Sequence, residues 1–297
     1  MSLLGPAFKI VSTLAFAVML VLVKLLAERV PSGEVVFFRS AFAVFPVLAM
    51  VWWQGELRDG LTTRRPGGHV MRSVYGVGAM MLWFAGVQRL PLADGLAITY
   101  AAPLVVVALA AILLGEKVRA HRWGAVAIGF VGVLIVLSPH LGDLERIGSD
   151  RGAAGAVMCF LSAFFMALAQ IEVSKLAATE KTGAIVVYFS VGSALFALLS
   201  LPFGWVMPST PDLAMLIALG LFGGIGQIFL TLAYRHADAS VVAPLEYASM
   251  IWAVASGLWF FDELPSLTML VGTLVIVASG IAIVWRERKV GVKRPQA

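Results

Sequence analysis

The sequence predicts an all-α membrane protein with ten transmembrane helices in two inverted five-helix repeats. Three observations predict this fold class: the composition, the length of the apolar runs and an internal echo. Hydrophobic residues make up 60% of the chain and charged residues 13%, whereas soluble domains carry about 25% charge. The apolar runs, of about 20 residues each, are long enough to cross a hydrocarbon core ~30 Å thick. Helices fit these runs because backbone groups in lipid must be satisfied within their own segment.

The internal echo consists of two stretches of the first half that return in the second half. The stretch 86–117 aligns without gaps on 233–264, and the stretch 24–38 aligns on 175–189 at nearly the same shift. Two echoes in the same order predict a duplicated unit of about half the chain. Five of the 32 pairs in the first alignment are identical, among them Tyr100 with Tyr247, Ala101 with Ala248 and Glu116 with Glu263.

Short connections, many of them with Pro or Gly, separate the apolar runs and leave no room for a soluble domain. Each half holds an odd number of spans, so the second half enters the membrane from the opposite side and the repeats are inverted. Such repeats are typical of transporters, which bind their solute near mid-membrane between the halves. The expected spans are about 8–27, 34–53, 70–89, 93–114, 122–138, 152–175, 183–203, 212–234, 239–261 and 266–285. The expected units are a first repeat (1–146), a second repeat (147–286) and a basic cytoplasmic tail (287–297).

The distribution of positive charge predicts the orientation of the chain. Lys and Arg, Lys9 and Arg72 among them, concentrate on the side that holds both termini, and such an excess marks the cytoplasmic side of a membrane. The first apolar run is too long for a signal-peptide core and no small-residue cleavage site follows it, so we expect a retained helix. The lone Cys159 excludes an intrachain disulfide and a cysteine-based metal site.

Two ionisable residues within predicted spans are the first functional candidates, because a charge at mid-helix costs roughly 2.5–3.5 kcal/mol. Arg39 lies near the outer end of the second span. It can bind a carboxylate or phosphate with two hydrogen bonds, or it can extend to the outer headgroups. Glu246 lies in the ninth span beside Tyr247. It can carry a proton or attract an amine, or it can be a structural carboxylate that is bonded internally.

Uncharged polar and aromatic side chains within the spans complete a predicted solute cavity. Tyr and Trp offer a flat apolar surface with one hydrogen-bonding group, which suits an amphipathic solute. The predicted lining residues are Tyr75, Trp83, Tyr100, Gln170, Gln227 and Tyr247, together with Arg39 and Glu246. Glu116 and Glu263 stand at span ends, where we expect them to bond backbone or neighbouring loops.

The sequence argues against several other classes. The four histidines, His69, His121, His140 and His236, fall in loops or at span edges, and the chain has no HExxH zinc motif. We therefore expect no enzyme, no catalytic residue, no metal site and no cofactor. The net charge of +5 does not indicate a nucleic-acid partner, because the basic residues lie in loops and in the tail. The expected partners are a small-molecule solute and the lipid bilayer.

Several short motifs resemble those of the drug/metabolite transporter superfamily, in its ten-helix EamA-type branch. They are Phe37-Phe38-Arg39-Ser40, Ala101-Ala102-Pro103, Leu113-Leu114-Gly115-Glu116 and Phe261-Asp262-Glu263. The resemblance covers essentially the whole chain. The second half departs from the pattern, since Met250 stands opposite Pro103 and Ser190 opposite Arg39.

The resemblance implies secondary transport of small organic metabolites in a bacterial inner membrane. Export of amino acids by alternating access is the preferred expectation. The alternative is uptake of a vitamin or nucleotide-like metabolite, of the riboflavin or S-adenosylmethionine type. A lipid flippase and a structural membrane protein are lower-ranked alternatives. The resemblance leaves open the substrate, the direction, coupling to protons, the resting orientation of the cavity and the oligomeric state.

Overall fold

The computed structural model describes residues 4–55, 62–113, 120–140, 151–177, 179–236 and 243–290. Within these ranges every regular element is a helix, and no strand occurs. The first half contains α1 (Leu4–Leu25), α2 (Ser32–Trp53), α3 (Pro66–Val87), α4 (Leu92–Thr99), α5 (Ala102–Leu113) and α6 (Ala120–Leu137). The second half contains α7 (Arg151–Ala177), α8 (Thr182–Ala197), η2 (Leu198–Phe203), α9 (Thr210–His236), η3 (Ala243–Tyr247), α11 (Ala248–Phe261) and α12 (Leu267–Val290).

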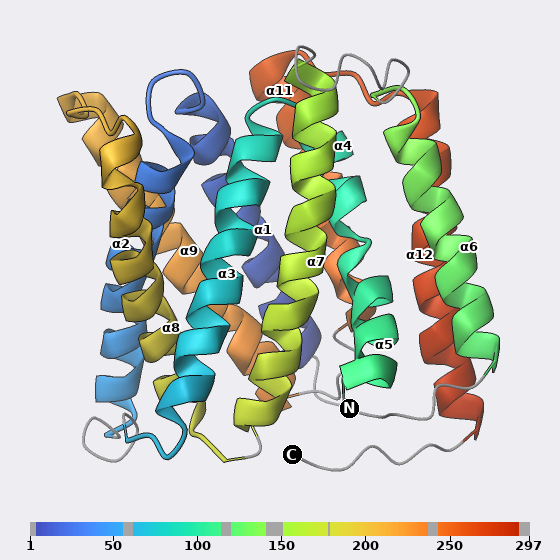
Figure 1. The fold of residues 1–297 in the computed structure, drawn as a ribbon, viewed down its shortest axis with the longest axis horizontal. Coiled ribbons are helices and arrows are strands. Elements are labelled where there is room, and N and C mark those ends of the chain that lie inside the picture. The colour runs from blue at the N-terminus through green and yellow to red at the C-terminus, as the bar shows by residue number, and fades with distance from the viewer. Residues whose placement is uncertain are drawn as a thin grey trace.

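Most of these helices have the length and composition of membrane spans. Among the described residues, seven helical stretches are long and apolar enough to cross a bilayer. Shorter apolar helices accompany them at Trp123–Leu137, Leu245–Phe261 and Leu267–Ala282. The helices form one bundle, in which α1 begins and α12 ends at the same face (Figure 1). The protein is therefore a multi-pass membrane protein.

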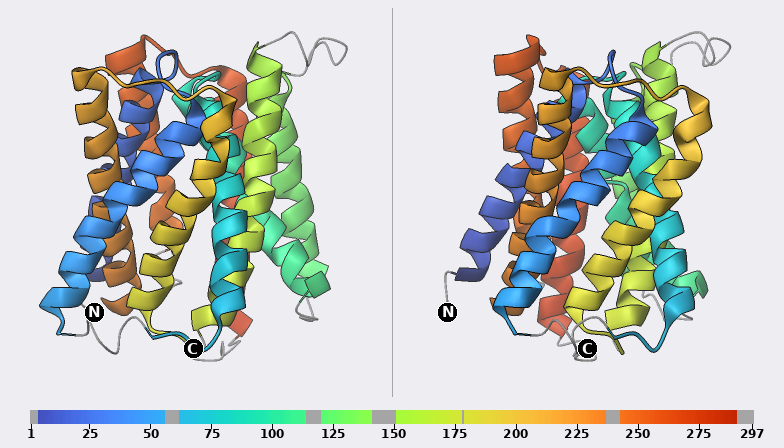
Figure 2. Two further views of the ribbon diagram at one scale, coloured as in Figure 1. Left: turned by 60° about the vertical axis from the view of Figure 1, so that its left-hand side comes forward. Right: turned by 90° about the vertical axis from the view of Figure 1, so that its left-hand side faces the viewer.

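The most extensive packing in the bundle joins helices of one half to helices of the other. α3 packs on α7, α1 and α2 pack on α9, and α6 packs on α12. α8 lies beside both α2 and α3 (Figure 2). A Cβ added to Gly132 of α6 would lie 2.8 Å from the carbonyl oxygen of Gly272 on α12, so this crossing requires glycine. The two halves are therefore packed directly against each other.

The predicted span 93–114 is interrupted in the structure. α4 ends at Thr99 and α5 begins at Ala102, so Tyr100 and Ala101 separate the two segments. Pro103 accounts for the break, because its ring would clash with the carbonyl of residue i−4, which is Thr99. The equivalent place in the second half is also irregular. There the 3₁₀ helix η3 ends at Tyr247 and α11 follows, although no proline stands at Met250.

A tight backbone turn ends α11. Asp262 adopts a left-handed conformation with φ of 53°, and the N–H of Glu263 donates to the carbonyl of Gly257 at 3.0 Å. The N–H of Asp262 donates to the same carbonyl, so the left-handed residue closes the end of the helix. The turn directs the Glu263 side chain back toward the bundle, where it meets groups of the first half.

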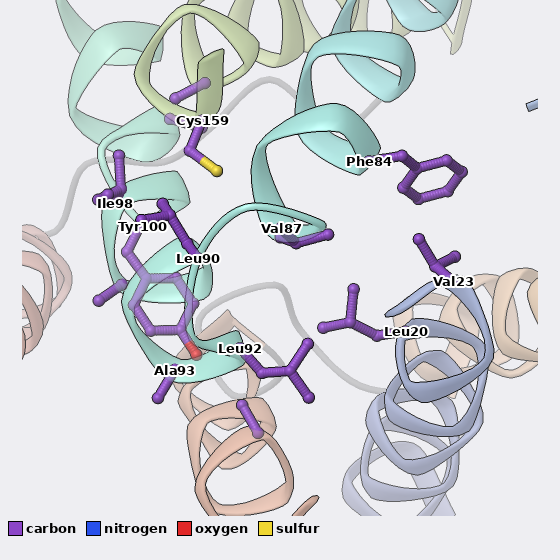
Figure 3. Close-up of a cluster of buried hydrophobic side chains, with 14 of the residues drawn as sticks. Leu20, Val23, Phe84, Val87, Leu90, Leu92, Ala93, Ile98, Tyr100 and Cys159 are labelled. Atoms are coloured by element: carbon purple, nitrogen blue, oxygen red, sulfur yellow. The ribbon is translucent and has the colours of Figure 1, made fainter. Parts of the chain in front are cut away.

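A core of buried apolar side chains lies between α1, α3 and α4. Leu20 and Val23 of α1 point toward Phe84 and Val87 of α3 (Figure 3), and each of these side chains is 5% exposed or less. Lipid tails are as apolar as leucine, so such a core holds membrane helices together through close packing more than through removal from water. The core holds α1 and α3 together.

Candidate functional site

The two tyrosines that the repeat alignment matches contact each other at the helix breaks. The rings of Tyr100 and Tyr247 lie 5.2 Å apart between centroids at an angle of 89°, an edge-to-face contact. The Tyr100 hydroxyl lies 2.6 Å from Ser249 Oγ. Equivalent residues of the two halves thus contact each other where each half departs from regular α-helix.

Glu246, beside this tyrosine pair, forms an ion pair with Lys9 of α1. The Lys9 side chain is completely buried, whereas that of Glu246 is 50% exposed. Sequence reasoning counted Lys9 among the cytoplasmic surface cations and missed this contact. The signal was present, because Lys9 falls within the predicted span 8–27, where an ionisable residue is a functional candidate by default.

Two further hydrogen bonds fix α1 close to this ion pair. Ser12 donates to the carbonyl of Gly226 on α9 at 2.8 Å. Trp252 of α11 donates through Nε1 to Thr13 Oγ1 at 3.2 Å. The α1 face that carries Lys9 is therefore bonded to two helices of the second half, and the Lys9–Glu246 pair lies on a boundary between the halves.

Arg39 belongs to a second polar cluster, formed by α2, α3 and α8. Its side chain is 8% exposed, and its guanidinium carbon lies 5.9 Å from the centroid of the Phe189 ring. Arg72 approaches the same ring to 3.9 Å. The guanidinium of Arg39 therefore lies inside the bundle, beside the Phe189 ring. Sequence reasoning placed Arg72 with the cytoplasmic cations and missed it.

The other predicted lining residues are spread over α3, α7 and α9. Tyr75 of α3 and Gln227 of α9 are half-buried, and Gln170 is exposed on α7. Trp83 contacts Phe84 with ring centroids 5.6 Å apart, and its buried Nε1 has no hydrogen-bond partner among the described residues. The predicted cavity lining thus separates into the tyrosine–Glu246 cluster, the arginine cluster and side chains dispersed on other helices.

Glu263 connects three parts of the bundle. Its carboxylate forms an ion pair with Lys24 of α1 and accepts a hydrogen bond from the N–H of Leu92 at 2.9 Å. Lys24 also donates to the carbonyl of Leu90 at 2.8 Å. The end of α11 is thereby bonded to α1 and to the start of α4. Glu116, its counterpart in the repeat alignment, lies outside the described residues.

Glu180 makes a comparable connection in the turn between α7 and α8. Its carboxylate accepts from the N–H groups of Arg64 and Arg65, at 2.8 and 3.0 Å, and from the Thr63 hydroxyl at 3.1 Å. Desolvation alone would raise the pKa of Glu180, but these hydrogen bonds and the nearby His69 outweigh it and lower the pKa below its ordinary value. The chain segment before α3 is therefore bonded to the second half by a carboxylate that stays ionised.

Comparison with known proteins identifies the family of the chain. The model of the EamA-like transporter family matches residues 3–138 and 153–285.

The chain belongs to the EamA-like transporter family.

Curated relatives of this EamA-family chain carry transporter names. It is 28% identical over 269 residues to an S-adenosylmethionine uptake transporter of Rickettsia prowazekii (strain Madrid E), covering 91% of this chain and 88% of the relative. It is 28% identical over 285 residues to the pseudopaline exporter CntI of Pseudomonas aeruginosa (strain UCBPP-PA14), covering 94% and 95%. An uncharacterized transporter of Helicobacter pylori (strain J99) is 30% identical over 291 residues, covering 95% and 94%.

A solved crystal structure shares the fold of this EamA-family chain, with a TM-score of 0.61 at 21% identity over 94% of this chain and 98% of that chain. The family and the names of these relatives identify a membrane transporter and not an enzyme.

Proposed function

We propose that this EamA-family chain is a secondary transporter that exports amino acids or closely related small metabolites by alternating access. The observation that carries the proposal is the meeting of Tyr100 and Tyr247 at the two helix breaks, with the Lys9–Glu246 ion pair beside them. Transporter folds place their solute where helices are interrupted near mid-membrane, between the repeats. A carboxylate beside two aromatic faces suits an amphipathic solute with an ammonium group.

The proposal includes ten membrane passes in two inverted repeats, 1–146 and 147–286. The structure supports this count if each interrupted pair of segments, α4 with α5, α8 with η2 and η3 with α11, forms one pass. The separate family matches to residues 3–138 and 153–285 support two units. The Lys and Arg distribution supports cytoplasmic termini in a bacterial inner membrane.

Uptake of a nucleotide-like metabolite is the second candidate. The relatives named as S-adenosylmethionine uptake transporters favour it. The relative named as an exporter favours the opposite direction. A solute with both an amine and a carboxylate would suit either the export or the uptake candidate. The bundle holds the Glu246 carboxylate in one cluster and the guanidinium groups of Arg39 and Arg72 in the other.

Solute exchange in proteoliposomes tests the proposed function. Vesicles loaded with unlabelled phenylalanine or methionine should accumulate the same labelled amino acid from outside in a saturable manner, with protein-free vesicles as the control. Vesicles loaded with S-adenosylmethionine test the second candidate in the same way. If only S-adenosylmethionine exchanges, amino-acid transport is wrong and the second candidate replaces it.

A further inference from the structure

Arg39, which is buried, and Arg72, which is half-buried, pair with no acidic side chain among the described residues. Arg39 of α2 and Arg72 of α3 lie beside one ring, that of Phe189 on α8, with their guanidinium carbons 5.9 and 3.9 Å from its centroid. The Nε atoms of both residues are buried and make no hydrogen bond among the described residues. An unpaired buried cation is costly, and a pair of like charges is more so, which calls for a counter-ion.

The surrounding helices supply no such counter-ion. α1, α3 and α8 contain no Asp or Glu in their sequences. α2 contains Glu34, which accepts a hydrogen bond from the N–H of Val206 at 3.1 Å. α9 contains Asp212, which pairs with Arg29 at 2.9 Å. α7, which packs on α3, contains Glu172, which pairs with Lys175 at 2.7 Å. The acidic side chains of the helices around the two arginines are therefore engaged elsewhere or absent.

Glycines make room for both guanidinium groups. A Cβ added to Gly76 of α3 would lie 2.6 Å from Arg72 Nη1, and one added to Gly223 of α9 would lie 3.3 Å from Arg39 Nε. Two hydroxyls close to this cluster in sequence, Ser40 Oγ on α2 and Ser193 Oγ on α8, are buried and have no partner among the described residues. Ser193 lies one turn beyond Phe189 on the same face of α8.

We propose that Arg39 and Arg72 bind an oxyanion group of the transported solute, a carboxylate or a phosphate, with the ring of Phe189 beside it. This inference rests on the proposed transport function and adds the chemical class of the solute. Guanidinium groups match the fork of a carboxylate or phosphate with paired hydrogen bonds. The anion supplies the charge that the surrounding helices lack, and the aromatic ring offers an apolar face to the solute body.

Thermal unfolding of the full-length protein in detergent micelles tests this site with small probes. Benzoate and phenyl phosphate should each raise the melting temperature of the wild-type protein in a saturable manner, because both bind the folded state. Benzamide, of the same shape as benzoate but uncharged, should have no such effect at equal concentration. The stronger of the two anions identifies the group that the site prefers.

Substitution of each arginine assigns the effect. In Arg39→Lys and Arg72→Lys the charge is kept and the fork is lost, so the concentration of benzoate for half-maximal stabilisation should rise at least about tenfold. Arg72→Met should abolish the effect. Arg151→Met is the matched control, since Arg151 is 62% exposed in a surface pair, and it should respond to the anions as the wild type does.

The outcomes separate this site from the transport proposal. Equal stabilisation by benzamide and benzoate would contradict the proposed oxyanion site, even if labelled amino acids exchange normally. Anion responses that survive in Arg39→Lys, Arg72→Lys and Arg72→Met would contradict it in the same way. Anion binding that depends on both arginines, together with no exchange of any solute, would instead leave the site intact and contradict the transport function.

Discussion

Lys9 of α1 and Glu246 of η3 form an ion pair between the first and second halves of the chain, with the lysine completely buried and the carboxylate half-exposed. This asymmetry means that the two partners depend on each other to different degrees. Without Glu246, Lys9 is left as a buried charge with no counter-ion. Without Lys9, Glu246 can still be hydrated.

A double-mutant cycle of Lys9→Met and Glu246→Gln should show this dependence in the thermal stability of the purified protein. Glu246→Gln should lower the melting temperature more than Lys9→Met does. Breaking a fully buried pair costs about 3–5 kcal/mol, and the exposure of Glu246 places the effect below that range. The double variant should be more stable than the two single effects predict together.

The exposed pair of Arg151 and Glu28 provides the control for this cycle. Their side chains are 62% and 77% exposed, so Arg151→Met should change the melting temperature little. Strictly additive effects of Lys9→Met and Glu246→Gln would show that the two side chains do not stabilise each other in the folded protein.

Reporter fusions should establish the orientation of the chain. Fusions after Pro66, Arg119 and Ala297 should report the cytoplasm, and a fusion after Gly142 should report the periplasm, because ten passes return the chain to its starting side. A periplasmic signal from the C-terminal fusion would contradict the count of ten passes.

The fold class and the family could be predicted from the sequence, because a bilayer constrains nearly every residue of a spanning segment. The break near Tyr100 has a local cause in Pro103, although the span was predicted to be continuous. At the second break, Met250 stands where the first half has proline, but Pro244 lies within η3 itself, three residues before Tyr247. A proline inside the predicted span 239–261 is a local signal for irregular helix.

The charged partners were harder to predict because they depend on long-range contacts. α3 begins at Pro66, four residues before the predicted span 70–89, so Arg72 lies about one turn deeper in the helix than its position near a span end suggested. Lys9 was treated as a surface cation although it falls inside a predicted span. The identity of a partner such as Glu246 or Phe189 is set by the packing of helices distant in sequence.

The ionised Glu180 should make the stability of the protein sensitive to acid. Its folded-state pKa is lowered, chiefly by hydrogen bonds that outweigh desolvation, so its contribution is fully present above the unfolded value, about 4.3 for Glu. The contribution is lost as the pH falls below that value toward the folded pKa. Melting temperatures of the wild type and Glu180→Gln should therefore differ at pH 7 and converge under acid conditions.

Glu28→Gln serves as the comparison for this pH series, because the Glu28 side chain is 77% exposed. It should track the wild type at every pH. A gap between the wild type and Glu180→Gln that stays constant or widens on acidification would show that the hydrogen bonds from Thr63, Arg64 and Arg65 do not depend on the carboxylate charge.

The role of Glu246 in transport separates into two alternatives that Glu246→Gln can distinguish. The second half places Glu246 where the first half has Thr99, and a symmetric packing role would not need a carboxylate on one side only. If Glu246 carries a coupling proton, Glu246→Gln should abolish flux driven by a pH gradient and spare solute exchange. If Glu246 contacts a cationic group of the solute, both activities should be lost.

Lys9→Met adds a second measurement that the Glu246 substitution alone does not provide. In the wild type, Lys9 occupies the carboxylate that a solute ammonium group would need. If Glu246 binds the solute, removal of Lys9 relieves this competition, and the apparent KM for exchange should fall. If Glu246 only carries a proton, the KM for exchange should stay unchanged. Normal flux and exchange in a stably folded Glu246→Gln protein would exclude both roles and leave the carboxylate as the structural partner of Lys9.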